Sequence, residues 1–362
     1  MQKYIFTILL LLTSITNARE NLVATQKIRL TLDSALQKQV KAMILEMKEK
    51  LRAKSIGIAI MDSHTGELLS LTGSDCNTIK EFPKNSIASF TYEPGFVMAP
   101  FVFSLALEKH LITPYDLING HQGRYQFRGR TIIDPHKFDY LSAANVIVYS
   151  SSIGMTQIAQ KLTGKDYYNG LVSFEFTQQS TPDFTNENIG FIPNANQLTK
   201  AIYKATASYG YGVKVNLLQL LKAYNLFNNN GKLIAPHIVV KESHSEARKI
   251  LSDKTVQDMK KILIETVEKG TAINAKTKAI KIGGKTGTAH VIEEGRYVKK
   301  YNCTFVGFAN DVKHRYTIAV LVQQPKTSIY ASKTAAVVFK KAVHILFQDS
   351  LLNNNTHQKD YK

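Results

Sequence analysis

Residues 283 to 289 read Gly-Gly-Lys-Thr-Gly-Thr-Ala, and this segment constrains the fold more than any other stretch of the chain. A Gly-Lys-Thr triplet occurs in phosphate-binding loops, which would make the chain a nucleotide-binding α/β protein. That loop requires a glycine five residues before Gly284, but Ala279 stands there. Gly287 would also interrupt the helix that has to begin at such a loop. We therefore reject nucleotide binding and predict a β-strand.

The rest of the chain predicts a mixed α/β domain. Apolar residues at helical spacing predict helices over residues 33–51, 100–109, 216–227, 252–269 and 335–347, and a pair of short helical segments within residues 142–162. Alternating or β-branched runs predict strands over residues 55–61, 67–71, 280–282, 304–308 and 316–323. We expect the first and last parts to form one antiparallel sheet flanked by helices, and the middle to form a helical lobe.

The first 18 residues have the pattern of an export signal. Lys3 precedes a twelve-residue apolar run from Tyr4 to Ile15, and Thr-Asn-Ala follows it. Such a run is too short to span a bilayer comfortably, so a cleaved signal peptide is favoured over a short retained anchor. Either alternative places the domain outside the cytoplasm, exported or anchored at a membrane. We expect one domain over residues 25–350 and a flexible polar tail over residues 351–362.

The formal net charge of +18 favours anionic partners such as acidic lipid or a wall polymer. The chain has no run of five like charges, so no nucleic-acid-binding arm is expected. Neither Cys76 nor Cys303 belongs to a metal-ligand spacing, and the ten histidines form no cluster. We expect no metal and no cofactor, and a disulfide between the two cysteines stays open.

Five further segments accompany the Lys-Thr-Gly strand: Tyr-Glu-Pro-Gly at 92–95, Ser-Ser-Ser-Ile-Gly at 150–154, Ser-Tyr-Gly-Tyr-Gly at 208–212, Gly-Thr-Ala at 270–272 and Phe-Val-Gly-Phe-Ala at 305–309. In this order they resemble the transpeptidase domain of class B penicillin-binding proteins, from about residue 28 to residue 343. The resemblance implies the penicillin-binding-protein/β-lactamase-like fold. It also implies a role in peptidoglycan synthesis, at cell division or elongation.

The resemblance assigns substrate binding to the strand residues Lys285, Thr286, Gly287 and Thr288. The lysine and threonine side chains would face the cleft and hold a substrate carboxylate by charge and hydroxyl hydrogen bonds. The glycine would let the substrate backbone lie close to the strand. The implied ligands are a peptidoglycan stem peptide or a β-lactam, held non-covalently, and the implied partner is a wall-polymerising membrane enzyme.

The chain departs from the family pattern at its reaction centre. The family has Ser-x-x-Lys directly after Glu-Pro-Gly, where the serine attacks and the lysine takes its proton, but Phe96 and Ala99 stand at these positions. No serine in the chain is followed by a lysine three residues later. The family's Ser-x-Asn is Ser150-Ser151-Ser152, which keeps the serine and loses the amide. We expect a non-catalytic member of this transpeptidase family.

Two alternatives stay open. An active D,D-transpeptidase would use a substitute nucleophile such as Ser150 or Ser89, although Ser150 could instead cap a helix. An envelope binding module for an anionic polymer would depend on the positive charge and lose affinity in salt. Class B proteins also carry a membrane-spanning helix and a pedestal domain, whereas only about 25 residues precede the predicted domain here, so contacts through a pedestal are not expected.

Overall fold

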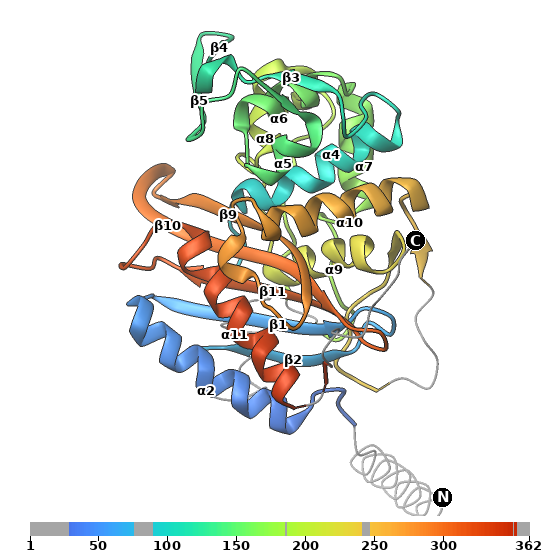
Figure 1. The fold of residues 1–362 in the computed structure, drawn as a ribbon, viewed down its shortest axis with the longest axis vertical. Helices are drawn as coiled ribbons and strands as arrows, with labels where there is room; N and C mark the ends of the chain where they lie inside the picture. The colour runs from blue at the N-terminus through green and yellow to red at the C-terminus, as the bar shows by residue number, and fades with distance from the viewer. Residues whose placement is uncertain (1–28, 76–89, 185–186, 241–246, 350, 353–362) are drawn as a thin grey trace, which may run out of the picture.

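The computed structural model describes residues 29–75, 90–184, 187–240, 247–349 and 351–352 (Figure 1). The predicted signal or anchor over residues 1–18 and most of the predicted tail lie outside these residues. Within the described part of the chain, no helix is both long enough and apolar enough to cross a membrane.

A five-stranded antiparallel sheet lies at the centre of the molecule. Its strands run in the order β2 (Leu68–Gly73), β1 (Ser55–Asp62), β11 (Arg315–Gln323), β10 (Arg296–Asn310) and β9 (Lys281–Glu293). Because β1 pairs with β11, the first and last parts of the domain share one sheet, as predicted. The predicted runs at 280–282 and 304–308 were too short, since β9 and β10 continue as a long polar hairpin beyond the core.

Two helices cover one face of the sheet (Figure 1). They are α2 (Ser34–Leu51) and α11 (Ala335–Gln348). The Asp33 carboxylate accepts hydrogen bonds from the backbone N–H groups of Ala35 and Leu36, so Asp33 is the N-cap of α2. Alternate strand residues, including Ile58 and Phe305, pack into this core.

The opposite face carries the second core and the helical lobe (Figure 1). Next to the sheet lie α9 (Leu217–Asn228) and α10 (Asp253–Glu268). The lobe contains α4 (Ala99–Glu108), α5 (Ala143–Val148), α6 (Ser152–Gln160), α7 (Gly164–Ser173) and α8 (Ala201–Ser208). Three small ribbons were not predicted: β3 (Leu117–Asn119) with β6 (Tyr140–Ser142), β4 (Arg124–Phe127) with β5 (Arg130–Ile133), and β7 (Lys232–Leu233) with β8 (Arg248–Lys249).

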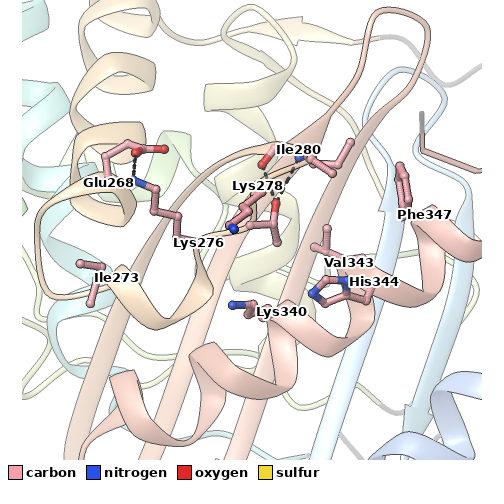
Figure 2. Close-up of a pocket in the computed structure, with 11 residues that line it drawn as sticks. Glu268, Ile273, Lys276, Lys278, Ile280, Lys340, Val343, His344 and Phe347 are labelled. Atoms are coloured by element: carbon pink, nitrogen blue, oxygen red, sulfur yellow. Dashed lines mark hydrogen bonds and ion pairs between the residues drawn. The ribbon is translucent and has the colours of Figure 1, made fainter. Parts of the chain in front are cut away.

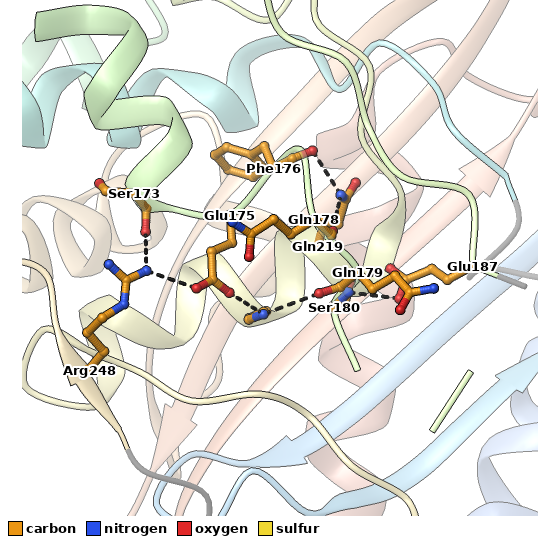
Figure 3. A network of polar contacts seen from close by, with 10 residues as sticks. Ser173, Glu175, Phe176, Gln178, Gln179, Ser180, Glu187, Gln219 and Arg248 are labelled. Carbon is orange, nitrogen blue, oxygen red and sulfur yellow. Dashed lines mark hydrogen bonds and ion pairs between the residues drawn. The ribbon is translucent and has the colours of Figure 1, made fainter. Parts of the chain in front are cut away.

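A polar network fastens the irregular segment after α7 onto α9 (Figure 3). The Glu175 carboxylate accepts from Lys222 Nζ at 2.5 Å and from Arg248 at 2.8 Å. The Gln219 amide donates to two backbone carbonyls of the segment, at 2.8 and 2.9 Å. Because Lys222 is only 5% exposed, its charge has to be paired in this way. The network therefore holds α9 in a fixed position, and α9 in turn supports the candidate site through Tyr224.

Candidate functional site

An aromatic ring occupies the position predicted to have lost its nucleophile. Phe96 lies in the short 3-10 helix η2 (Gly95–Met98), which leads directly into α4. Its half-buried side chain packs against the core on the lobe side of the sheet, and its ring centroid lies 5.0 Å from Lys285 Nζ. Ala99, the first residue of α4, is fully buried. The hydroxyl of Tyr224 donates to the Val97 carbonyl at 2.7 Å and holds η2 in place.

Lys285 lies within β9 and its amine points toward the lobe. Lys285 Nζ donates to Ser150 Oγ at 2.5 Å, to Thr271 Oγ1 at 3.3 Å and to the Thr286 carbonyl at 3.4 Å. The side chain is fully buried, and no carboxylate among the described residues pairs with it. Burial lowers the pKa of Lys285 to about 7, because a charged amine is poorly solvated there. Near neutral pH the charged and the neutral forms of the Lys285 amine are therefore both populated.

Ser150 lies in the short link between α5 and α6, with its backbone in the left-handed region at a φ of 57°. Its neighbour Ser151 is the N-cap of α6 and accepts from the Gly154 N–H at 2.9 Å. The interpretation of Ser150 as a helix cap is therefore wrong. Its hydroxyl instead contacts Lys285 Nζ and lies 3.1 Å from Thr271 Oγ1.

A buried carboxylate that the sequence analysis did not single out fixes this link. Asp134, which directly follows β5, is 7% exposed and accepts from the Ser151 hydroxyl. It also accepts from the backbone N–H groups of Ser152 at 2.7 Å and Ile153 at 3.3 Å. These N–H groups open α6 and would otherwise lack partners. Burial raises the pKa of Asp134, although the hydrogen bonds oppose that effect.

Thr271 joins the hydroxyls around Lys285 into one cluster. It follows α10, and its Oγ1 lies 3.3 Å from Thr286 Oγ1 in addition to its contacts with Ser150 and Lys285. We call Ser150, Thr271, Lys285 and Thr286 the amine–hydroxyl cluster. Thr288 lies apart from this cluster: its Oγ1 accepts from the Ala331 N–H at 3.1 Å and ties β9 to η6 (Ala331–Lys333).

Glycines bring the predicted segments into contact around the cluster. A Cβ on Gly287 would lie 2.3 Å from the Pro94 carbonyl oxygen, and a Cβ on Gly210 would lie 2.0 Å from that of Gly95. Both positions therefore require glycine. Glu93 anchors the same loop by accepting from the Gly212 N–H at 2.8 Å and from the Tyr297 hydroxyl at 3.0 Å. Burial raises the pKa of Glu93.

The structure therefore brings together Phe96, Ser150 and Lys285, which sequence reasoning named, and adds Thr271 and Asp134. Thr271 belongs to the Gly-Thr-Ala segment, so a signal for it was present in the sequence. Asp134 had no such signal, because a single aspartate after a short strand is common in turns. Cys303 is a buried free thiol, and Cys76 lies outside the described residues. In the described ranges no cluster of three His, Cys, Asp or Glu residues could hold a metal.

The family model described as "Penicillin binding protein transpeptidase domain" matches residues 56–344. The "Probable peptidoglycan D,D-transpeptidase PenA" of Neisseria flavescens is 27% identical over 302 residues, which cover 81% of this chain and 75% of that protein. PenA of Neisseria gonorrhoeae is 25% identical over 322 residues, covering 86% of this chain and 55% of that protein. The chain thus spans little more than half the length of the second relative.

The fold has solved relatives as well. The transpeptidase domain of Burkholderia pseudomallei penicillin-binding protein 3 superposes with a TM-score of 0.83 at 30% sequence identity. The superposition covers 92% of this chain and 99% of that chain. The mixed α/β fold that the sequence predicts is therefore confirmed.

Proposed function

The chain belongs to the penicillin-binding-protein transpeptidase domain family, and from this premise we propose that it binds carboxylate-ended wall peptides in peptidoglycan synthesis without being acylated at position 96. The observation that carries this proposal is the Phe96 ring, whose centroid lies 5.0 Å from Lys285 Nζ. A phenyl ring supplies no attacking atom, and Ala99 supplies no base to a nucleophile. The reaction centre of the family is missing beside an intact Lys-Thr-Gly strand.

The amine–hydroxyl cluster supports the binding half of the proposal. A carboxylate entering the cluster would meet a protonated Lys285 amine and up to three hydroxyl donors, from Ser150, Thr271 and Thr286. Within the described residues the buried amine has no carboxylate partner, so a ligand carboxylate would supply the missing negative charge. Stem peptides and β-lactams both carry such a carboxylate.

Intact-protein mass spectrometry after incubation with penicillin tests the catalytic half. We expect no covalent adduct on the native chain and non-covalent binding of a peptide ending in D-Ala-D-Ala, measured by calorimetry. The Lys285→Met variant should lose that binding, and the Lys38→Met variant, changed at an exposed lysine on α2, should keep it. A penicillin adduct on the native chain would contradict the proposal. Restoration of the family motifs by Phe96→Ser, Ala99→Lys and Ser152→Asn together serves as the positive control for acylation.

One observation favours a second candidate, an acyltransferase with Ser150 as its nucleophile. Ser150 Oγ lies 2.5 Å from an amine whose pKa is about 7, which suits a general base. Ser150 Oγ would attack the peptide carbonyl carbon and pass its proton to neutral Lys285 Nζ. The bond from that carbon to the leaving D-alanine nitrogen would then break, and Lys285 would return the proton to the departing amine. Water or a second amine would release the acyl group from Ser150.

The two candidates differ in one measurable property. An acyl-Ser150 enzyme would give a penicillin adduct that peptide mapping locates on Ser150 and that Ser150→Ala abolishes. A binding domain would give no adduct, and Ser150→Ala would only weaken the non-covalent affinity by removing one donor.

The remaining parts of the proposal concern location. We propose that residues 1–18 export the chain, so that the domain over residues 25–350 works in the periplasm beside a wall-polymerising membrane enzyme. The pattern of Lys3 and the apolar run after it supports export. Fusion of residues 1–30 to a reporter active only in the periplasm tests this: an inactive reporter would refute it.

A further inference from the structure

A groove separate from the amine–hydroxyl cluster lies on the face of the sheet covered by α2 and α11 (Figure 2). Its volume is about 880 Å³. One wall is formed by α11 and the other by the end of α10, the 3-10 helix η5 (Ile273–Ala275) and the segment before β9. None of its lining residues belongs to the site described above.

The two walls combine apolar and cationic side chains. On α11, the residues at positions 340, 343, 344 and 347 share one face of the helix by their spacing and line the groove. They are Lys340, Val343, His344 and Phe347. The facing wall contributes Ile273, which is 53% exposed, with Lys276, Lys278 and Ile280.

The positive charge of the groove is incompletely compensated. The acid that lines it, Glu268, already pairs with Lys276. Within the described residues, Lys278 and Lys340 make no ion pair, and His344 has no acidic partner. Two lysine amines therefore remain available to an anionic ligand at a groove whose lining is also apolar.

The wall that carries Lys278 is already ordered. The Thr277 hydroxyl donates to the Ile280 carbonyl at 2.7 Å and accepts from the Ile280 N–H at 3.2 Å, which closes a tight loop around Lys278. The Asn274 amide donates to the Ser332 carbonyl at 3.0 Å and fastens η5 to the segment before α11. A preformed wall costs a ligand little ordering entropy.

We propose that this groove docks an acidic amphipathic peptide segment of a partner protein. Its apolar side chains would contact Ile273 and Phe347, and its carboxylates would pair with Lys278 and Lys340. A polyanion without apolar groups would leave the apolar lining unused, and a flat membrane surface cannot enter a concave groove. The chain's own last ten residues carry two lysines and one aspartate, a charge that does not complement the groove. The net charge of +18 likewise disfavours a second copy.

The probe is a short fluorescent peptide of leucine and glutamate residues, and the readout is fluorescence anisotropy with the full chain. Lys278→Glu with Lys340→Glu should weaken binding by about tenfold or more, since attraction becomes repulsion. Lys38→Glu with Lys313→Glu, at two exposed lysines outside the groove, changes the net charge equally and should leave the affinity near its native value. Ile273→Ser should weaken binding by about threefold, and it alters an exposed side chain that the fold does not require.

Four control ligands decide against the other occupants. A peptide with glutamine in place of glutamate and a peptide with serine in place of leucine should both bind at least about tenfold more weakly. Inorganic polyphosphate or vesicles of anionic phosphatidylglycerol binding through Lys278 and Lys340 as strongly as the peptide would overturn the proposal. Equal loss of peptide affinity in the groove variant and the control variant would also overturn it, because the attraction would then be general.

Discussion

Replacing Lys285 by methionine should change how the stability of the protein depends on pH. The amine is fully buried, and its pKa lies at about 7 instead of 10.5. At about 1.4 kcal/mol per pKa unit, this shift corresponds to about 5 kcal/mol of unfavourable free energy in the charged folded state. The substitution also removes the hydrogen bonds from Lys285 to Ser150 and Thr271. Each is worth about 1 to 3 kcal/mol, so their loss offsets part of any stability gained by removing the charge.

The direction of this pH dependence follows from the number of protons that the folded and unfolded states bind. Between about pH 7 and about pH 10.5 the unfolded chain keeps the Lys285 proton and the folded chain has released it. The free energy of unfolding of the native chain therefore rises with pH in this window, by up to about 1.4 kcal/mol per pH unit. Below about pH 7 both states are charged and the full penalty remains. The free energy of unfolding of Lys285→Met minus that of the native chain should therefore be largest below about pH 7. This difference should fall as the pH rises.

Urea denaturation of both proteins at several values from about pH 6 to about pH 9 measures their free energies of unfolding. Subtracting one free energy from the other cancels the contributions of groups that titrate in the same way in both proteins. The Lys38→Met variant, changed at an exposed lysine, should follow the native chain at every pH. Parallel curves for Lys285→Met and the native chain would refute the reasoning, because they would mean that the Lys285 pKa is the same folded and unfolded.

Three more results are expected. Affinity for a peptide ending in D-Ala-D-Ala should be constant below about pH 7 and fall by up to about tenfold per pH unit above it, because the peptide carboxylate needs a protonated Lys285. Calorimetry that shows the same affinity at every pH would contradict this expectation. Asp134→Ala should lower the free energy of unfolding by about 2 to 4 kcal/mol, measured by urea denaturation, because it leaves the N–H groups of Ser152 and Ile153 without partners. A loss below about 0.5 kcal/mol would show that these N–H groups find other acceptors. Gly287→Ala should lower the stability by about 1 to 3 kcal/mol through its clash with Pro94, and unchanged thermal unfolding would show that the loop can move away.

Most of the fold follows from local patterns in the sequence. Asp33 and Asn216 cap the helices that the apolar spacing predicts, and the central strands are built from alternating or β-branched residues. The three small ribbons could not be predicted, because strands of two to four residues carry too little pattern. The hairpin of β9 and β10 was underestimated because its outer half is polar, and cross-strand hydrogen bonds extend it beyond the buried core.

The residue types alone establish what is chemically missing, since Phe96 and Ala99 lack a nucleophile and a base in any conformation. The surroundings of Lys285, in contrast, depend on how the whole chain packs. Ser150 reaches the amine from the link between α5 and α6, Thr271 reaches it from the segment after α10, and Asp134 orders the link that carries Ser150. The pKa of about 7 exists only because packing removes water from the amine, and solvent exclusion is a property of the folded whole that no residue spacing records.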